Sequence, residues 1–92
     1  MYLLQIDPGN GPTKHNIGYI YLFKFNDPGR SISYFTDALM DDQKLVNAYY
    51  HRGYAYEKLG KKDLAIKDYK KCIQIDSLFV LPKERLKKLG VK

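Results

Sequence analysis

The chain has 92 residues, of which 45% are hydrophobic, and a formal net charge of +6 at pH 7. This apolar content is too high for a disordered chain, and no apolar run approaches the roughly 18–20 residues that cross a bilayer. The length suffices for one small domain. Cys72 is the only cysteine, which excludes an intrachain disulfide and favours a reducing, cytoplasmic location, with a leader in a longer parent chain left open.

Apolar residues recur at helical spacing in successive segments, so the sequence predicts an all-α chain of helices and turns. Asp27 is expected to cap the second helix, with Pro28 at its first position, and Gly60 is expected to end the third. The predicted helices cover residues of about 13–25, 28–41, 45–58, 62–75 and 82–89.

The sequence repeats itself with a period of 34 residues. Asp7 and Asp42 are 35 residues apart, and Asp42 and Asp76 are 34 apart, in similar surroundings. Other pairs agree, and together they place one extra residue of the first copy between Tyr21 and Ser31. We expect this extra residue in the turn at 26–30, because turns tolerate insertions best.

The second copy carries the most complete motif. Tyr49-x-x-Arg52-Gly53-x-x-Tyr56, followed by Ala65-x-x-x-Tyr69, resembles the tetratricopeptide repeat, whose period is also 34 residues. This copy departs from the family at three positions. Tyr49 stands where tryptophan is usual, Arg52 where leucine is usual, and Ser77 where proline is usual.

The first copy resembles the same repeat less closely. Gly18 and Tyr21 fit the first helix, and Phe35 and Ala38 fit the second. The departures are that Lys14 takes the aromatic position and Ser31 replaces the small alanine. Ten residues of the two copies are expected to pack the helix crossings: Gly18, Tyr21, Phe35, Ala38, Tyr49, Gly53, Tyr56, Ala65, Tyr69 and Cys72.

The resemblance implies an α-solenoid of stacked antiparallel helix pairs, with about two tetratricopeptide repeats and a C-terminal capping helix in a single domain, 1–92. Residues 1–8 would be the end of a preceding repeat or an N-terminal strip. Repeat one would cover 9–42, repeat two 43–77, and the capping helix 78–92.

The resemblance also implies a protein-interaction module, in which the first helices of successive repeats line a concave groove for a partner's peptide or helix. This groove would be rich in aromatic residues, which suit peptide recognition. The alternative is that Tyr50 and Tyr54 only cover a neighbouring repeat absent from this chain. The expected groove residues are Pro12, His15, Tyr19, Leu22, Phe23, Asn47, Tyr50, Tyr54, Glu57 and Lys58.

Some members of the family hold the C-terminal carboxylate of chaperones with a clamp of lysines, asparagines and an arginine. Of the residues at the matching positions only Arg85 fits, which disfavours this subtype. The matching positions hold His15, Tyr19, His51, Leu81 and Arg85.

A rival function is nucleic-acid binding, because residues 58–92 carry 11 basic and 4 acidic side chains. On the expected register most of these lysines lie outside the groove, and no stacking aromatics interleave with them, so a protein partner is favoured. The lysines concerned are Lys61, Lys62, Lys67, Lys70, Lys71, Lys83, Lys87 and Lys88.

The sequence predicts no enzyme, no cofactor and no metal site. His15 and His51 are the only histidines, and two imidazoles without a third ligand make a poor zinc site. Cys72 falls at a helix crossing, where a buried thiol without a neighbouring base is inert. There is no glycine-rich phosphate loop.

The N-terminal residues bear on assembly. Tyr2, Leu3, Leu4 and Ile6 would be uncovered in a monomer, and arrays of this kind generally need three or more units. We therefore expect that the chain is part of a longer array, and that the isolated chain forms a homodimer through this end.

Overall fold

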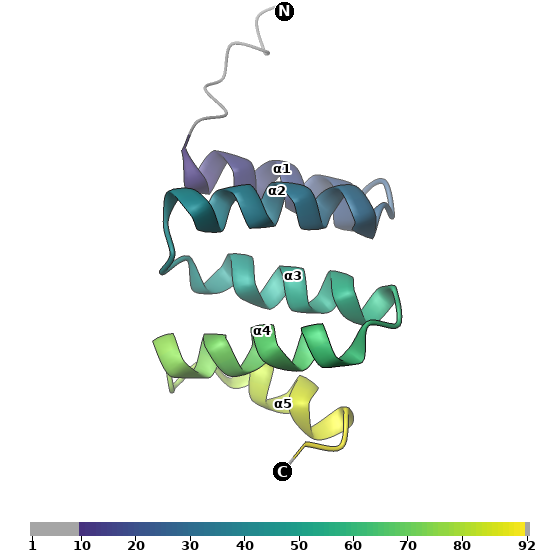
Figure 1. Cartoon of the computed structure of the whole chain (residues 1–92), viewed down its shortest axis with the longest axis vertical. Coiled ribbons are helices and arrows are strands. Elements are labelled where there is room, and N and C mark those ends of the chain that lie inside the picture. The colour runs from purple at the N-terminus through teal and green to yellow at the C-terminus, as the bar shows by residue number, and fades with distance from the viewer. Residues whose placement is uncertain (1–9, 92) are drawn as a thin grey trace, which may run out of the picture.

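A computed structural model describes residues 10–91, which form five helices and no strand (Figure 1). The predicted all-α fold is therefore confirmed. The first helix begins at Gly11, two residues earlier than expected, because Asn10 caps it by accepting a hydrogen bond from the Thr13 backbone N–H at 2.8 Å. The N-terminal strip of the predicted dimer lies outside the described residues. The helices are α1 (Gly11–Phe23), α2 (Pro28–Asp41), α3 (Val46–Lys58), α4 (Lys62–Ile75) and α5 (Val80–Lys88).

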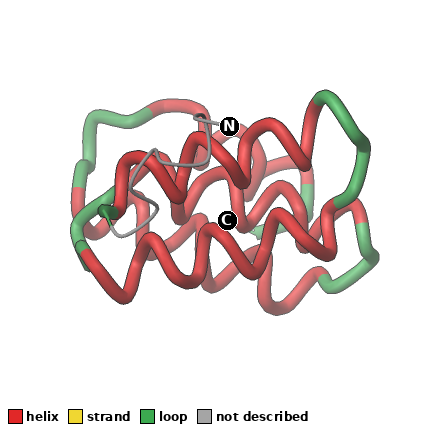
Figure 2. The backbone as a smooth tube through the Cα atoms, turned by 90° about the horizontal axis from the view of Figure 1, so that it is seen from above, coloured by secondary structure: helices red, strands yellow, loops and turns green. Residues whose placement is uncertain are grey.

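The helices form a stack in chain order. α1 packs on α2, α2 on α3, α3 on α4, and α4 on α5. The connecting turns lie alternately at the two ends of the helices, so that neighbouring helices run antiparallel (Figures 1 and 2). The result is elongated, 48 × 24 × 17 Å, as expected for a chain in which each helix pair contacts only its neighbours.

The turns within the two helix pairs differ in length by one residue. Residues 24–27 join α1 to α2, whereas residues 59–61 join α3 to α4, so the extra residue lies in the predicted turn. Asn26 has a φ of 51° there and Gly60 has a φ of 76° in the second turn, both in the left-handed region that ends helices. Asp27 caps α2 as expected, accepting from the Arg30 backbone N–H at 3.1 Å.

A glycine against an aromatic ring marks the crossing in each helix pair. A Cβ atom on Gly18 would lie 2.7 Å from the Phe35 ring, and one on Gly53 would lie 2.9 Å from the Tyr69 ring. Both rings are fully buried. Of the ten expected packing residues, only the tyrosines at 21, 49 and 56 are half-buried; the others are buried.

Two departures of the first copy from the repeat motif are compensated by polar contacts. Lys14, at the usual aromatic position, forms an ion pair with Asp41 of α2 at 2.7 Å. Ser31, at the usual alanine position, is fully buried. Its hydroxyl group donates a hydrogen bond to the Pro28 carbonyl oxygen at 2.7 Å. Because each polar group has a partner, the helix pair keeps its packing.

Arg52 joins three helices. Its Nε and Nη2 atoms donate to the two carboxylate oxygens of Asp68 in α4, both at 2.8 Å, and Nη1 donates to Thr36 Oγ1 in α2 at 3.1 Å. The hydrogen bond to Asp68 raises the pKa of Arg52, although burial acts in the opposite direction. The departure from leucine at this position therefore creates a bidentate ion pair between α3 and α4 and a hydrogen bond from α3 to α2.

Candidate aromatic binding surface

Six ring-bearing residues of α1, α3 and the turn before α5 form what we call the aromatic face. The members are Tyr19, Phe23, Tyr50, His51, Tyr54 and Phe79. Phe23 of α1 stacks on Tyr54 of α3 with ring centroids 5.7 Å apart, and Tyr50 of α3 lies 5.5 Å from Phe79. The ring contacts therefore continue from the first helix pair to the second.

His51 is the centre of the aromatic face. Its ring lies 5.2 Å from Tyr19, 5.9 Å from Phe23 and 5.4 Å from Tyr50, in each case edge to face. On its inner side it meets the buried Phe35 ring at 6.0 Å. An imidazole so surrounded has lost much of its hydration, which favours the neutral form.

His51 also forms a hydrogen bond with His15 of α1, between Nδ1 and Nε2, at 2.9 Å. Burial first, and the nearby His15 second, lower the pKa of His51 to about 4, although the Asn47 backbone acts in the opposite direction. Burial also lowers the pKa of His15, against a hydrogen bond with Asn16. Because a hydrogen bond between two imidazoles needs a lone pair on one of them, at least one ring is neutral.

Glu57, at the edge of the aromatic face, is bonded within the chain. Its carboxylate accepts from Arg85 Nε at 2.9 Å, from Arg85 Nη2 at 2.6 Å and from the Tyr69 hydroxyl at 2.6 Å. Burial by itself raises the pKa of Glu57, but the hydrogen bonds from Arg85 and Tyr69 outweigh it and hold the pKa below its usual value. Glu57 therefore ties α3 to α4 and α5.

The structure brings together most of the expected groove residues. Tyr19 and Phe23 are 45% and 48% exposed, Lys58 lies over the Tyr54 ring at 5.7 Å, and Pro12 and Asn47 are exposed. The prediction that Leu22 lines the groove is wrong. It is 1% exposed, because it packs with Phe35 and Ala55 in the core, and it has no surface to offer a partner.

Two members of the aromatic face were not among the expected groove residues. His51 lies two residues before Gly53, and Phe79 precedes α5. His51, Tyr54 and Lys58 follow the i, i+3, i+7 spacing of one helical stripe, which is the signal that identifies His51. Phe79 has no such signal, because its place depends on how α5 packs.

The chaperone-tail clamp is disfavoured further by the contacts of Arg85. This is the one residue that matches the clamp, and its guanidinium is already paired with Glu57 and lies 5.5 Å from the Tyr54 ring centroid. Within residues 10–91, no cluster of three or more potential ligands could hold a metal ion. None of the helices described is long and apolar enough to cross a membrane.

Comparisons with known proteins agree with this architecture. Residues 46–77, which span α3 and α4, match the family model of the tetratricopeptide repeat. The crystal structure of MamA superimposes with a TM-score of 0.79 at 24% identity, over 86% of this chain and 46% of that chain. The present chain thus spans about half the length of MamA. No curated protein matches the sequence.

The family match covers the second helix pair, and the first pair repeats its geometry, with Gly18 against Phe35 as Gly53 is against Tyr69. Residues 46–77 therefore carry a tetratricopeptide repeat, a motif that generally mediates protein–protein interaction.

Proposed function

We propose that the chain is a protein-interaction module without catalytic activity, and that the aromatic face binds an apolar peptide or helix of a partner protein. The observation that carries this proposal is the contact between Phe23 and Tyr54. These rings stack across the boundary between the helix pairs, yet Phe23 remains 48% exposed. Exposed rings held rigidly by their neighbours bind partners with little loss of side-chain entropy.

The composition of the aromatic face defines the partner's chemistry. Tyr19, Phe23 and His51 form an edge-to-face cluster, and a leucine or aromatic side chain would bury apolar area against it. Lys58 and the tyrosine hydroxyls at its border provide polar groups for the backbone of the ligand. The proposed partner is therefore an amphipathic segment whose apolar side lies on this face.

The test is selection of a random peptide library on the chain, followed by affinity measurements with point variants. Phe23→Ser and Tyr19→Ser should each weaken the selected peptides roughly tenfold or more, as is typical of central aromatic residues in interfaces. Phe25→Ser is the matched control. Phe25 is also exposed, at 59%, but its ring lies 5.6 Å from Tyr21, outside the aromatic face.

Equal weakening by Phe25→Ser, or full affinity in both Phe23→Ser and Tyr19→Ser, would contradict the proposal. Circular dichroism of each variant shows whether the helices are retained. The homodimer through the N-terminal strip also stays a prediction, and sedimentation at micromolar concentration measures it directly.

A further inference from the structure

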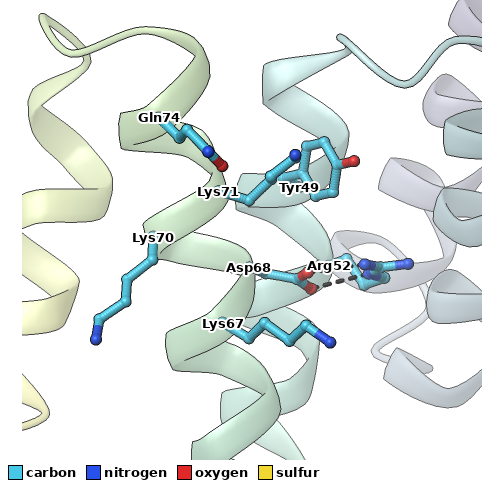
Figure 3. A pocket seen from close by; sticks show the side chains of 7 residues that line it. All are labelled: Tyr49, Arg52, Lys67, Asp68, Lys70, Lys71 and Gln74. Atoms are coloured by element: carbon cyan, nitrogen blue, oxygen red, sulfur yellow. Dashed lines mark hydrogen bonds and ion pairs between the residues drawn. The ribbon is translucent and has the colours of Figure 1, made fainter.

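A cavity of about 550 Å³ lies between α3 and α4. Figure 3 shows the side chains that line it. Tyr49 and Arg52 line it from α3, and Lys67, Lys70 and Lys71 line it from α4. Successive residues of a helix are turned by about 100°, which places Tyr49 and Arg52 on the opposite side of α3 from Tyr54 and His51. The cavity is therefore separate from the proposed peptide site.

The charges around the cavity do not balance. Asp68 is the only acidic residue in its lining, and Arg52 occupies both of its carboxylate oxygens at 2.8 Å. Lys67, Lys70 and Lys71 are exposed and form no ion pair with any residue of the described part of the chain. Three positive charges at one cavity thus lack a counter-charge.

The lysines follow one stripe of α4. They stand at i, i+3 and i+4, with Gln74 at i+7, so that the stripe is roughly 10 Å long at a rise of 1.5 Å per residue. In an extended peptide, alternate side chains lie on one side about 6.6 Å apart, close to the separation of charges one helical turn apart. Alternating carboxylates therefore match this stripe.

We propose that this cavity is a second binding site, and that its ligand is an acidic peptide segment with carboxylates at alternate positions. Two carboxylates pair with Lys67 and Lys71, whose side chains point toward α3 whereas that of Lys70 points away (Figure 3), and Gln74 donates to the peptide backbone. The half-buried Tyr49 ring and the aliphatic stems of the lysines form the walls. The chain would thus hold two segments, on opposite sides of α3.

The geometry favours carboxylates over phosphates. The one guanidinium at the cavity, that of Arg52, already donates to Asp68 and to Thr36, so no free bidentate donor is left for a phosphate. Tyr49 is the one ring in the cavity lining, and the Arg52 guanidinium lies 5.7 Å from its centroid. A single, partly covered ring is a poor platform for stacked bases, which disfavours nucleic acid.

The experiment measures fluorescence anisotropy of a labelled octapeptide with alternating glutamate and serine, at 50 and 150 mM salt. Its glutamine counterpart, single-stranded oligouridine and inorganic tripolyphosphate are the comparison ligands. The variant Lys67→Gln/Lys71→Gln removes the two charges that point toward α3. Lys61→Gln/Lys62→Gln removes the same number of charges from the start of the same helix, outside the cavity.

We expect the glutamate peptide to bind more tightly than the other ligands, and Lys67→Gln/Lys71→Gln to weaken its binding about tenfold, against less than about twofold for the control variant. Phe23→Ser should leave this affinity unchanged, which separates the site from the aromatic face. Equal losses in both lysine variants, or tighter binding of oligouridine or tripolyphosphate, would overturn the proposal. All these lysines are exposed, so the variants should keep the thermal transition of the parent chain.

Discussion

His15 Nε2 and His51 Nδ1 lie 2.9 Å apart and join the first helices of the two repeats. The two residues are 36 positions apart in the sequence, and their rings are packed among Tyr19, Phe23 and Phe35. Two protonated imidazoles at this distance would repel each other and lose the acceptor of the hydrogen bond. The contact between the repeats therefore depends on the neutral form.

Stability should fall as the pH is lowered from 7 to 5. The pKa of His51 is about 4 and that of His15 is also lowered, so over this range the unfolded chain binds more protons than the folded chain. The free energy of unfolding should decrease by about 1–2 kcal/mol, as measured by urea denaturation at the two pH values. The variant His51→Phe, which keeps a ring but does not titrate, should show a smaller decrease. A parent chain equally stable at both pH values would contradict this.

Removal of one partner of the Arg52–Asp68 pair should lower the stability of the chain substantially. The Asp68 side chain is 5% exposed, so Arg52→Met leaves a buried carboxylate without its partner and should lower the free energy of unfolding by about 3 kcal/mol. Arg52→Met/Asp68→Leu removes both charges and should be closer in stability to the parent chain. Thermal and urea unfolding of the parent, single and double variants measure this coupling. Purely additive effects would show that the two side chains do not interact.

Gly53→Ala should destabilise the second repeat. The added Cβ would lie 2.9 Å from Tyr69 Cε1, and this ring is buried and hydrogen-bonded to Glu57, so it has no room to move. We expect a loss of about 1–3 kcal/mol from overpacking, reduced by the better helix propensity of alanine. Gly29→Ala is the control, because its nearest atom would lie 3.7 Å away. If both variants melt at the same temperature as the parent, α3 and α4 do not cross as closely at Gly53 as described.

Cys72 should react slowly in the native chain. Burial first, and the charge of Asp68 second, raise the pKa of the Cys72 thiol to about 12, and Sγ lies 3.5 Å from the Val46 carbonyl oxygen. Because the thiolate is the nucleophile, iodoacetamide at pH 8 should alkylate the folded chain on the order of a hundredfold more slowly than the urea-unfolded chain. Mass spectrometry at timed intervals gives the two rates. Similar rates would mean that the thiol is accessible and not a packing residue.

The fold follows from short-range patterns that a sequence displays. Gly18 and Gly53, each followed by a large ring on the next helix, fix the crossing of the helix pairs, and the caps at Asp27 and Gly60 fix the turns. The side chains of the candidate site are harder to assign, because their neighbours come from other helices. Leu22 stands four residues after Gly18, on the same face of α1, and Phe35 and Ala55 of the neighbouring helices cover it.

Polar contacts between helices have no pattern in the sequence. The histidine pair depends on how α1 stacks on α3, and nothing near Arg52 in the sequence indicates Asp68 or Thr36 as its partners. Two departures from the repeat motif are positions where such contacts occur. Lys14 and Arg52 both replace apolar residues of the motif, and each has an acidic partner on the following helix.

The triple hydrogen bond at Glu57 has a consequence for the dynamics of the C-terminal end. A helix of 9 residues that packs mainly on α4 is short enough to fray on its own. The partly buried Arg85 links it to Glu57, which also holds Tyr69, so opening α5 strips this carboxylate of two charge-assisted donors. Amide protons of α5 should therefore exchange with solvent at rates close to those of α4, and the helices α3, α4 and α5 should open as one cooperative unit.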